Sequence, residues 1–343
     1  MRWALAALAL ALASPASAAE QPMRILGEIT APEGGTTPRR FILDIVVWTT
    51  PDPQRRELNG WLAVLAPTPQ GGGVTGHCDG ERCAVTSQIG YTNFVVQTAL
   101  PATGELPTGA YAYTGVGEPQ HEGEVRLTRL GREAPGLGTF APPDSVGAVA
   151  LSDLLDWNGF SQGFMNDVSE GPPGERERKG LSAWQTAQGR PAGGLILRED
   201  LKLLRAEALR ARKALRWTPA AGKGWRGAYP AAWLRPDGSG ARFVSEDGEA
   251  RVSIHVDPPM SGDDWQAFTN AATEGDENRK VLTGTRIDDD MELTLQIADR
   301  ISHVAYHRRP EGVATLTLSY PAARRADWTV AAAAIVRAFQ AAP

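Results

Sequence analysis

The sequence has no excess of basic residues. It carries 35 lysines and arginines against 40 aspartates and glutamates, which gives a formal net charge of −5 at neutral pH. Proteins that bind nucleic acid or an anionic membrane usually present a basic face. The charge balance therefore argues against both classes, and we expect no nucleic acid among the partners of this chain.

Cysteine is almost absent, since Cys78 and Cys83 are the only two in the chain. Four residues separate them, and Asp79-Gly80 among these is a good turn dipeptide. In an oxidising compartment this spacing predicts a disulfide that closes a tight hairpin. A metal site with His77 is the alternative, but it lacks a second cluster of ligands.

Long apolar runs are also missing, except at the N-terminus. Arg2 precedes an apolar run from Trp3 to Ala13, and small residues follow up to Ala18 and Ala19. This layout is typical of a secretory signal, and the run is too short for a membrane span of about 20 residues. We expect a signal peptide over 1–19, cleaved after Ala18 or Ala19. The mature chain would then be periplasmic or secreted, with no transmembrane segment.

No motif for metal or nucleophilic chemistry stands out. The five histidines lack the spacing of metal ligands, and His303 and His307 fall on one face of a predicted strand, where we expect two exposed side chains. Residues Asp288–Asp290 lack the glycine and glutamate of a calcium loop and indicate a solvated turn. We expect no catalytic residue, no metal and no cofactor. A catalytic site assembled from dispersed residues stays open as an alternative.

The first hundred residues of the mature chain have the pattern of β-structure. Short runs of β-branched and aromatic residues alternate with clusters of glycine and proline, such as Pro67–Gly73. This pattern predicts an antiparallel β-sandwich or barrel over residues 20–133. The strands expected there are 41–48, 61–65, 83–87, 93–97 and 124–130.

The hydrophobic period changes after a Gly- and Pro-rich stretch, which we interpret as a linker over 134–145. A period of 3.6 residues predicts three helices in a small domain over 146–218, ending near 157, 188 and 215. Strands and two further helices alternate in a last domain over 219–343, which favours an α+β fold. The helices expected there are 263–273 and 324–340, and the strands are 241–245, 250–254, 279–284, 292–298, 301–308 and 313–320.

The helical segment resembles the three-helix peptidoglycan-binding domain of bacterial wall enzymes. The match covers residues 146–208 and departs from the family pattern in two places: a glutamine is missing from the first helix, and Gly171–Glu175 replaces a compact turn. Trp184 of the motif is expected in the core. The residues that carry the match are Leu155, Gly159, Phe160, Gly163, Asp167, Arg178, Leu181, Trp184, Gln185, Gly189, Pro191, Gly194, Asp200, Leu201 and Leu204. The resemblance and the aromatic residues near the loop imply ligand contacts from Trp157, Asn158, Phe160, Asp167, Arg178 and Gln185.

The last segment is similar to PsbP-like domains, which occur in a photosystem extrinsic protein of plants and in related bacterial proteins. The residues that carry this similarity are Tyr229-Pro230, Ser245–Gly248, Ser319–Pro321 and Phe339. Members of that fold mostly act as binding or assembly factors, so the similarity implies a role of this kind.

Together these features favour a non-catalytic, exported protein of the cell envelope that binds peptidoglycan through its helical domain. One alternative is a periplasmic protein-interaction or assembly factor whose helical domain no longer binds a ligand, with an envelope protein as its partner. A second alternative is a wall-active enzyme with an unrecognised site.

Overall fold

A computed structural model of the chain describes residues 21–29, 38–52, 54–66, 68–89, 91–101, 103–115, 119–160 and 171–342. The predicted signal peptide, 1–19, and the candidate residue Asp167 lie outside these ranges. The chain divides into two compact units, of which the first ends at Gly131 and the second begins at Arg132.

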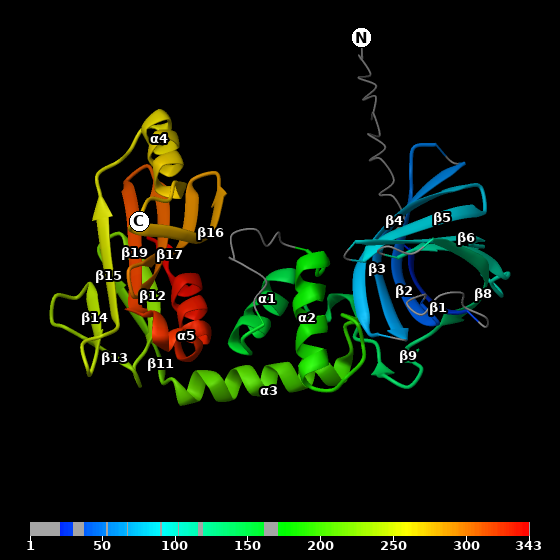
Figure 1. The fold of residues 1–343 in the computed structure, drawn as a ribbon, viewed down its shortest axis with the longest axis horizontal. Coiled ribbons are helices and arrows are strands. Elements are labelled where there is room, and N and C mark those ends of the chain that lie inside the picture. The colour runs from blue at the N-terminus through cyan, green and yellow to red at the C-terminus, as the bar shows by residue number, and fades with distance from the viewer. Residues whose placement is uncertain are drawn as a thin grey trace, which may run out of the picture. The chain divides into compact units, whose positions relative to one another are not determined.

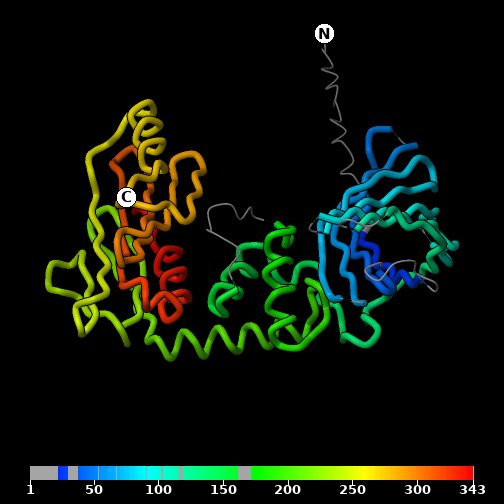
Figure 2. The backbone as a smooth tube through the Cα atoms, in the orientation of Figure 1, coloured from blue at the N-terminus to red at the C-terminus, as the bar shows by residue number. Residues whose placement is uncertain are grey.

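The first unit is a closed antiparallel barrel of eight strands in sequential order, in which β8 pairs back onto β1 (Figures 1 and 2). Of the two architectures expected here, the barrel is the one that forms. Closure leaves no free sheet edge, so every strand has a partner on both sides. The strands are β1 (Gln21–Glu28), β2 (Arg40–Thr49), β3 (Arg55–Ala66), β4 (Gln70–Asp79), β5 (Arg82–Ile89), β6 (Thr92–Ala99), β7 (Gly109–Thr114) and β8 (Gln120–Leu130).

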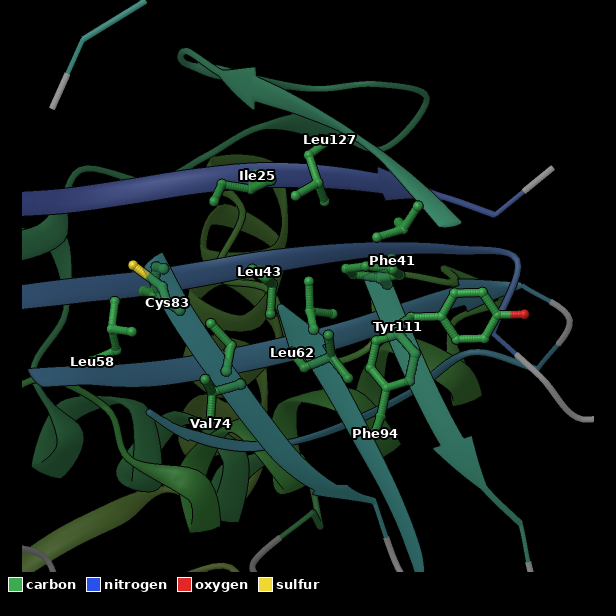
Figure 3. Close-up of a cluster of buried hydrophobic side chains, with 14 of the residues drawn as sticks. Ile25, Phe41, Leu43, Leu58, Leu62, Val74, Cys83, Phe94, Tyr111 and Leu127 are labelled. Atoms are coloured by element: carbon green, nitrogen blue, oxygen red, sulfur yellow. The ribbon is translucent and has the colours of Figure 1, made fainter. Parts of the chain in front are cut away.

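Side chains fill the interior of the barrel (Figure 3). Alternate residues of each strand point inward, because successive side chains of a β-strand face opposite sides. The ring of Phe94 lies 5.0 Å from that of Phe41 in an edge-to-face contact and 6.3 Å from that of Tyr111. The barrel is therefore held by an apolar core of its own.

The sequence pattern missed β1, β4 and β7. In particular, the glycines at 71–73 lie inside β4, although we expected the segment Pro67–Gly73 to separate strands. A Cβ atom at Gly72 would lie 2.4 Å from the carbonyl oxygen of Gln88 on β5. Here glycine allows two backbones to approach closely within the sheet. A cluster of glycines in the sequence does not show whether it serves this purpose or forms a turn.

The predicted disulfide between Cys78 and Cys83 is confirmed. The two residues lie directly opposite each other on β4 and β5, and Gly80 in the turn between them has a φ of +62°. Both cysteines are buried in the core of the barrel.

The second unit begins with a short hairpin of β9 (Glu133–Ala134) and β10 (Gly138–Thr139), followed by a 3-10 turn, η1 (Pro143–Ser145). This is the segment interpreted as a linker. The amide of Ala141 donates to the carbonyl oxygen of Ile196 at 2.9 Å, and Phe140 forms an isolated bridge with Leu197. Helices α1 (Ala148–Trp157), α2 (Glu175–Ala187) and α3 (Arg198–Ala214) follow at the expected places.

The rest of the second unit is built on a seven-stranded antiparallel sheet with the order β13-β14-β15-β19-β18-β17-β16, beside a small sheet β11-β12-β20 (Figure 1). The strands are β11 (Trp217–Gly222), β12 (Trp225–Pro230), β13 (Leu234–Pro236), β14 (Arg242–Ser245), β15 (Arg251–Asp257), β16 (Arg279–Ile287), β17 (Asp290–Ile297), β18 (Arg300–Arg309), β19 (Gly312–Pro321) and β20 (Gln340–Ala341). The helices are α4 (Gly262–Thr273), α5 (Arg325–Ala338) and the 3-10 turn η3 (Ala322–Arg324).

The two helices of this part cover opposite faces of the large sheet. Trp328 and Ile335 of α5 share a core with residues such as Leu316 on one face. Trp265 of α4 packs against Met291 and other residues on the opposite face. In the described part of the chain, none of the helices is long and apolar enough to cross a membrane.

We predict that the double variant Cys78→Ala/Cys83→Ala keeps the barrel but loses about 2 kcal/mol of stability. The bridge closes a short loop, so its removal returns little conformational entropy to the unfolded chain. Denaturant unfolding followed by Trp fluorescence measures the difference, and the reduced wild type serves as the control. A barrel that no longer folds after reduction would show that the bridge has a larger role than its loop length implies.

Candidate functional site

The three helices α1–α3 share an apolar core, in which Trp184 of α2 is fully buried as expected. The indole Nε1 of Trp184 donates to a carboxylate oxygen of Glu207 on α3 at 3.1 Å. The other core residues are Ala141, Val146, Leu151, Leu155, Leu181, Leu201 and Leu204. The apolar residues that recur with a period of 3.6 in the sequence therefore face one another in a single core between the helices.

Gln185, a candidate ligand residue, is 0% exposed. Its Nε2 donates to the carbonyl oxygen of Leu195 at 2.8 Å and to Asp200 at 2.6 Å, and its Oε1 accepts from the amide of Gly194 at 2.8 Å. Asp200 is equally buried, which raises the pKa of its carboxyl group, and it also pairs with Arg190. The side chain of Gln185 thus holds the turn after α2 onto α3 and presents no atom to solvent.

Trp157, which we expected at the surface, is 4% exposed and lies in a contact between α1 and the sheet region. Its ring is 5.0 Å from that of Trp217 on β11, edge to face, and the guanidinium of Arg212 on α3 lies 5.1 Å from its centroid. Trp157 was expected to contact a ligand. Instead it packs within the unit, against the ring of Trp217 and the guanidinium of Arg212.

Of the remaining candidate residues that the structure describes, Asn158 and Phe160 follow α1, whereas Arg178 belongs to α2. Asn158 donates to the carbonyl oxygens of Leu154 and Leu204, and Phe160 packs half-buried against the helical core. Arg178 lies in the first turns of α2, where its Nε donates to the carbonyl oxygen of Pro173 at 3.3 Å. Asn158 follows the C-terminal end of α1, whereas the N-terminal end of α2 contacts Ser152 through Glu177. The sequence motif is therefore distributed over the helical segment.

Ionisable side chains gather elsewhere, on the face of the large sheet that α5 covers. Asp290 and Glu292 of β17 lie on this face together with His303 and His307 of β18. His307 is buried and its Nδ1 lies 2.9 Å from Asp290, and His303 is half-buried. The expectation of two exposed strand histidines is therefore wrong for both residues. Burial raises the pKa of Asp290, but hydrogen bonds from His307 and Arg309 outweigh it, and its net pKa is lower than usual.

Glu292 is the most perturbed carboxyl group of this cluster. It is 3% exposed, and burial raises its pKa to about 7, with a further contribution from the charge of Asp290. The charge of Arg176, in the first turn of α2, acts in the opposite direction. A group with this pKa binds and releases a proton near neutral pH, at a place where the helical segment and the sheet meet.

His303 belongs to a second polar chain on the same face. Its Nε2 lies 2.8 Å from the hydroxyl of Tyr320, and its Nδ1 lies 3.1 Å from the hydroxyl of Thr294. Burial lowers the pKa of His303 to about 4 and raises that of Tyr320 to about 12, so both are neutral at physiological pH. The Tyr320 ring stacks on Trp328 of α5 at 5.4 Å.

This arrangement provides buried proton binding. In the described residues, no group of three or more histidine, cysteine, aspartate or glutamate side chains has the geometry to hold a metal ion. Sequence reasoning missed the cluster because the period of two shows only that 290, 292, 303 and 307 share faces of their strands. It does not show that α5 covers that face.

The chain has little detectable similarity to known proteins. No protein-family model matches it, and no curated protein matches it either. Among solved structures it is similar to the solution structure of cyanobacterial PsbP (CyanoP) from Synechocystis sp. PCC 6803, with 15% identity over 37% of this chain and 92% of that chain. The TM-score is 0.27, which is a weak likeness. The resemblance to peptidoglycan-binding domains finds no support in these comparisons.

We predict that Glu292→Gln changes stability in a pH-dependent way. The folded state keeps a proton on Glu292 up to about pH 7, whereas the unfolded chain releases it near the ordinary value of 4.5. The stability of the wild type should therefore fall as pH rises through this window, by about 3 kcal/mol, and the amide of the variant should remove that fall.

Chemical unfolding of the wild type and the variant at about pH 4 and about pH 8 tests this expectation. Glu311→Gln, in the exposed turn between β18 and β19, is the matched control and should show no such difference. If Glu292→Gln shifts stability equally at both pH values, the carboxyl group does not titrate as described.

Proposed function

We propose that this protein is a non-catalytic binding protein of the cell envelope and that peptidoglycan is the ligand of its helical segment, 146–218. The export-type N-terminus and the resemblance of 146–208 to wall-binding domains motivate this proposal. The observation that supports it best is the Gln185 network, because it joins α2 to α3 beside Trp184, the other residue of the motif, which lies in the shared core of the three helices.

The network also defines which surface is available for a ligand. Because Gln185 fixes the backbone at Gly194 and Leu195, the preceding segment, Thr186–Pro191, which comprises the end of α2 and the turn after it, is held in place. Thr186, Gln188 and Pro191 are exposed there. A pre-organised turn with exposed polar groups loses little conformational entropy when it binds a sugar or a peptide. We therefore assign wall contact to this turn rather than to the buried Trp157.

The alternative, a protein-interaction or assembly factor, is favoured by a different observation. Two of the candidate ligand residues, Trp157 and Gln185, are used for packing within the unit. The helical segment then acts as one part of a larger scaffold, together with a sheet region that we infer to be PsbP-like. In this case a partner protein, not glycan, would contact the exposed surface.

Co-sedimentation of the full mature chain with purified peptidoglycan sacculi separates these two functions. Binding to sacculi, with at least a fivefold loss in the variant Thr186→Ala/Gln188→Ala, is expected if the turn contacts the wall, since each lost polar contact costs on the order of 1 kcal/mol. Asn278→Ala, an exposed amide in the sheet region, is the matched control. A chain that stays in the supernatant at low salt would reject wall binding and leave the assembly role.

A further inference from the structure

The outer face of α3 carries an unusual concentration of positive charge. Its exposed charged side chains, together with that of Arg216 just after it, comprise seven basic residues and one acidic residue in a chain whose net charge is negative. They are Arg198, Lys202, Arg205, Arg210, Arg212, Lys213 and Arg216, against Glu199. The net charge of the whole chain argued against an anionic surface as a partner. A net charge does not show, however, that the fold gathers basic residues on one face.

Most of these residues form a single stripe. Intervals of three and four residues place their side chains on one side of a helix. The stripe extends about 22 Å from Arg198 to Lys213 at 1.5 Å per residue. Its members on the helix are Arg198, Lys202, Arg205, Leu209 and Lys213, all of them exposed. Arg216, also exposed, follows the end of α3 and has a φ of +50°.

The stability of the helix explains only part of the stripe. Lys213, in the last turn of α3, suits the negative end of the helix dipole. Arg198 stands at the N-terminal end of α3, where the helix dipole disfavours a positive charge. Within the part of the chain that the structure describes, the side chains of Lys202, Lys213 and Arg216 form no hydrogen bond or ion pair.

Three other cations of α3 have partners. Arg205 donates to the carbonyl oxygen of Ser145 at 2.9 Å, and Arg210 lies 3.8 Å from Glu207. Arg212 pairs with Asp153 and packs on Trp157. Repulsion between unpaired like charges costs stability unless a partner offsets it.

Two apolar side chains accompany the charges. Leu209 lies in the middle of the stripe and is 53% exposed. Trp233 is 37% exposed and follows two residues that are bonded to the chain just after α3: the amide of Ala232 donates to the carbonyl oxygen of Leu215, the C-cap, at 3.1 Å, and that of Ala231 to Arg216 at 3.3 Å. Its ring is kept in place by an edge-to-face contact with Trp328 at 5.2 Å.

We propose that this face of α3, with Leu209 and Trp233, docks on a lipid bilayer that contains anionic headgroups. A straight row of cations matches a flat, negatively charged surface, and each lysine or arginine near such a surface adds to the attraction. Leucine and tryptophan beside these cations reach the boundary between headgroups and acyl chains, where tryptophan is favoured. The charges alone would also fit a soluble acidic polymer, but that partner would leave the two apolar side chains exposed.

Vesicle sedimentation with the full mature chain tests this proposal. We expect binding to phosphatidylcholine vesicles that contain phosphatidylglycerol, weak binding to vesicles of phosphatidylcholine alone, and a decrease with rising salt. Lys202→Gln/Lys213→Gln/Arg216→Gln should reduce the partition coefficient about 100-fold, because each cation contributes roughly fivefold. Leu209→Ser should reduce it several-fold without changing the salt dependence.

The matched control is Lys223→Gln/Lys280→Gln/Arg286→Gln, which removes the same charge from exposed positions elsewhere in the second unit. Equal loss in the two triple variants would overturn the proposal, since general electrostatics would then suffice. So would binding to soluble polyglutamate that persists when vesicles are not bound. Sacculi are absent from these assays, so a failure here leaves peptidoglycan binding untouched, and the reverse also holds.

Discussion

A buried cation connects the two parts of the second unit. Arg337 of α5 has a side chain that is only 10% exposed, and burial lowers its pKa to about 10. Its Nη1 lies 3.0 Å from Asp153 of α1, and the guanidinium also pairs with Asp156. Since a buried charge without a partner is very costly, α1 cannot leave α5 without exposing or stranding these groups. The helical segment and the sheet are therefore one body.

The contact between α1 and α5 explains why Trp157, an expected ligand residue, is buried. Once α1 is fixed to α5, Trp157 lies against Trp217 and Arg212, and it is no longer available at the surface. The charge of Arg176, on α2, also lowers the pKa of Glu292, on the sheet. The end of α2 with the loop after it and the basic face of α3 stay exposed.

Local patterns predicted most elements and few of their contacts. The 3.6-residue period located α1 to α5 within a few residues, and the spacing of Cys78 and Cys83 predicted their bridge. The glycines of β4 led to a wrong prediction of a turn, because glycine occurs both in turns and where two backbones approach closely within a sheet. Trp157 and His307 misled for another reason: whether a side chain on a helix or strand is covered depends on a segment far away in the sequence, here β11 and α5. The cluster of Asp290, Glu292, His303 and His307 could not be predicted from the sequence for the same reason.

Native-state hydrogen exchange tests the claim of a single body most directly. If the Arg337 junction joins the two parts, the slowest amides of α1, α3 and α5 should exchange through one common opening, with the same free energy and the same dependence on denaturant. Arg337→Met should lower that free energy for all three helices together. Amides of α1 and α3 that exchange with a lower free energy than those of α5 and β19 would show two independent parts and contradict the account.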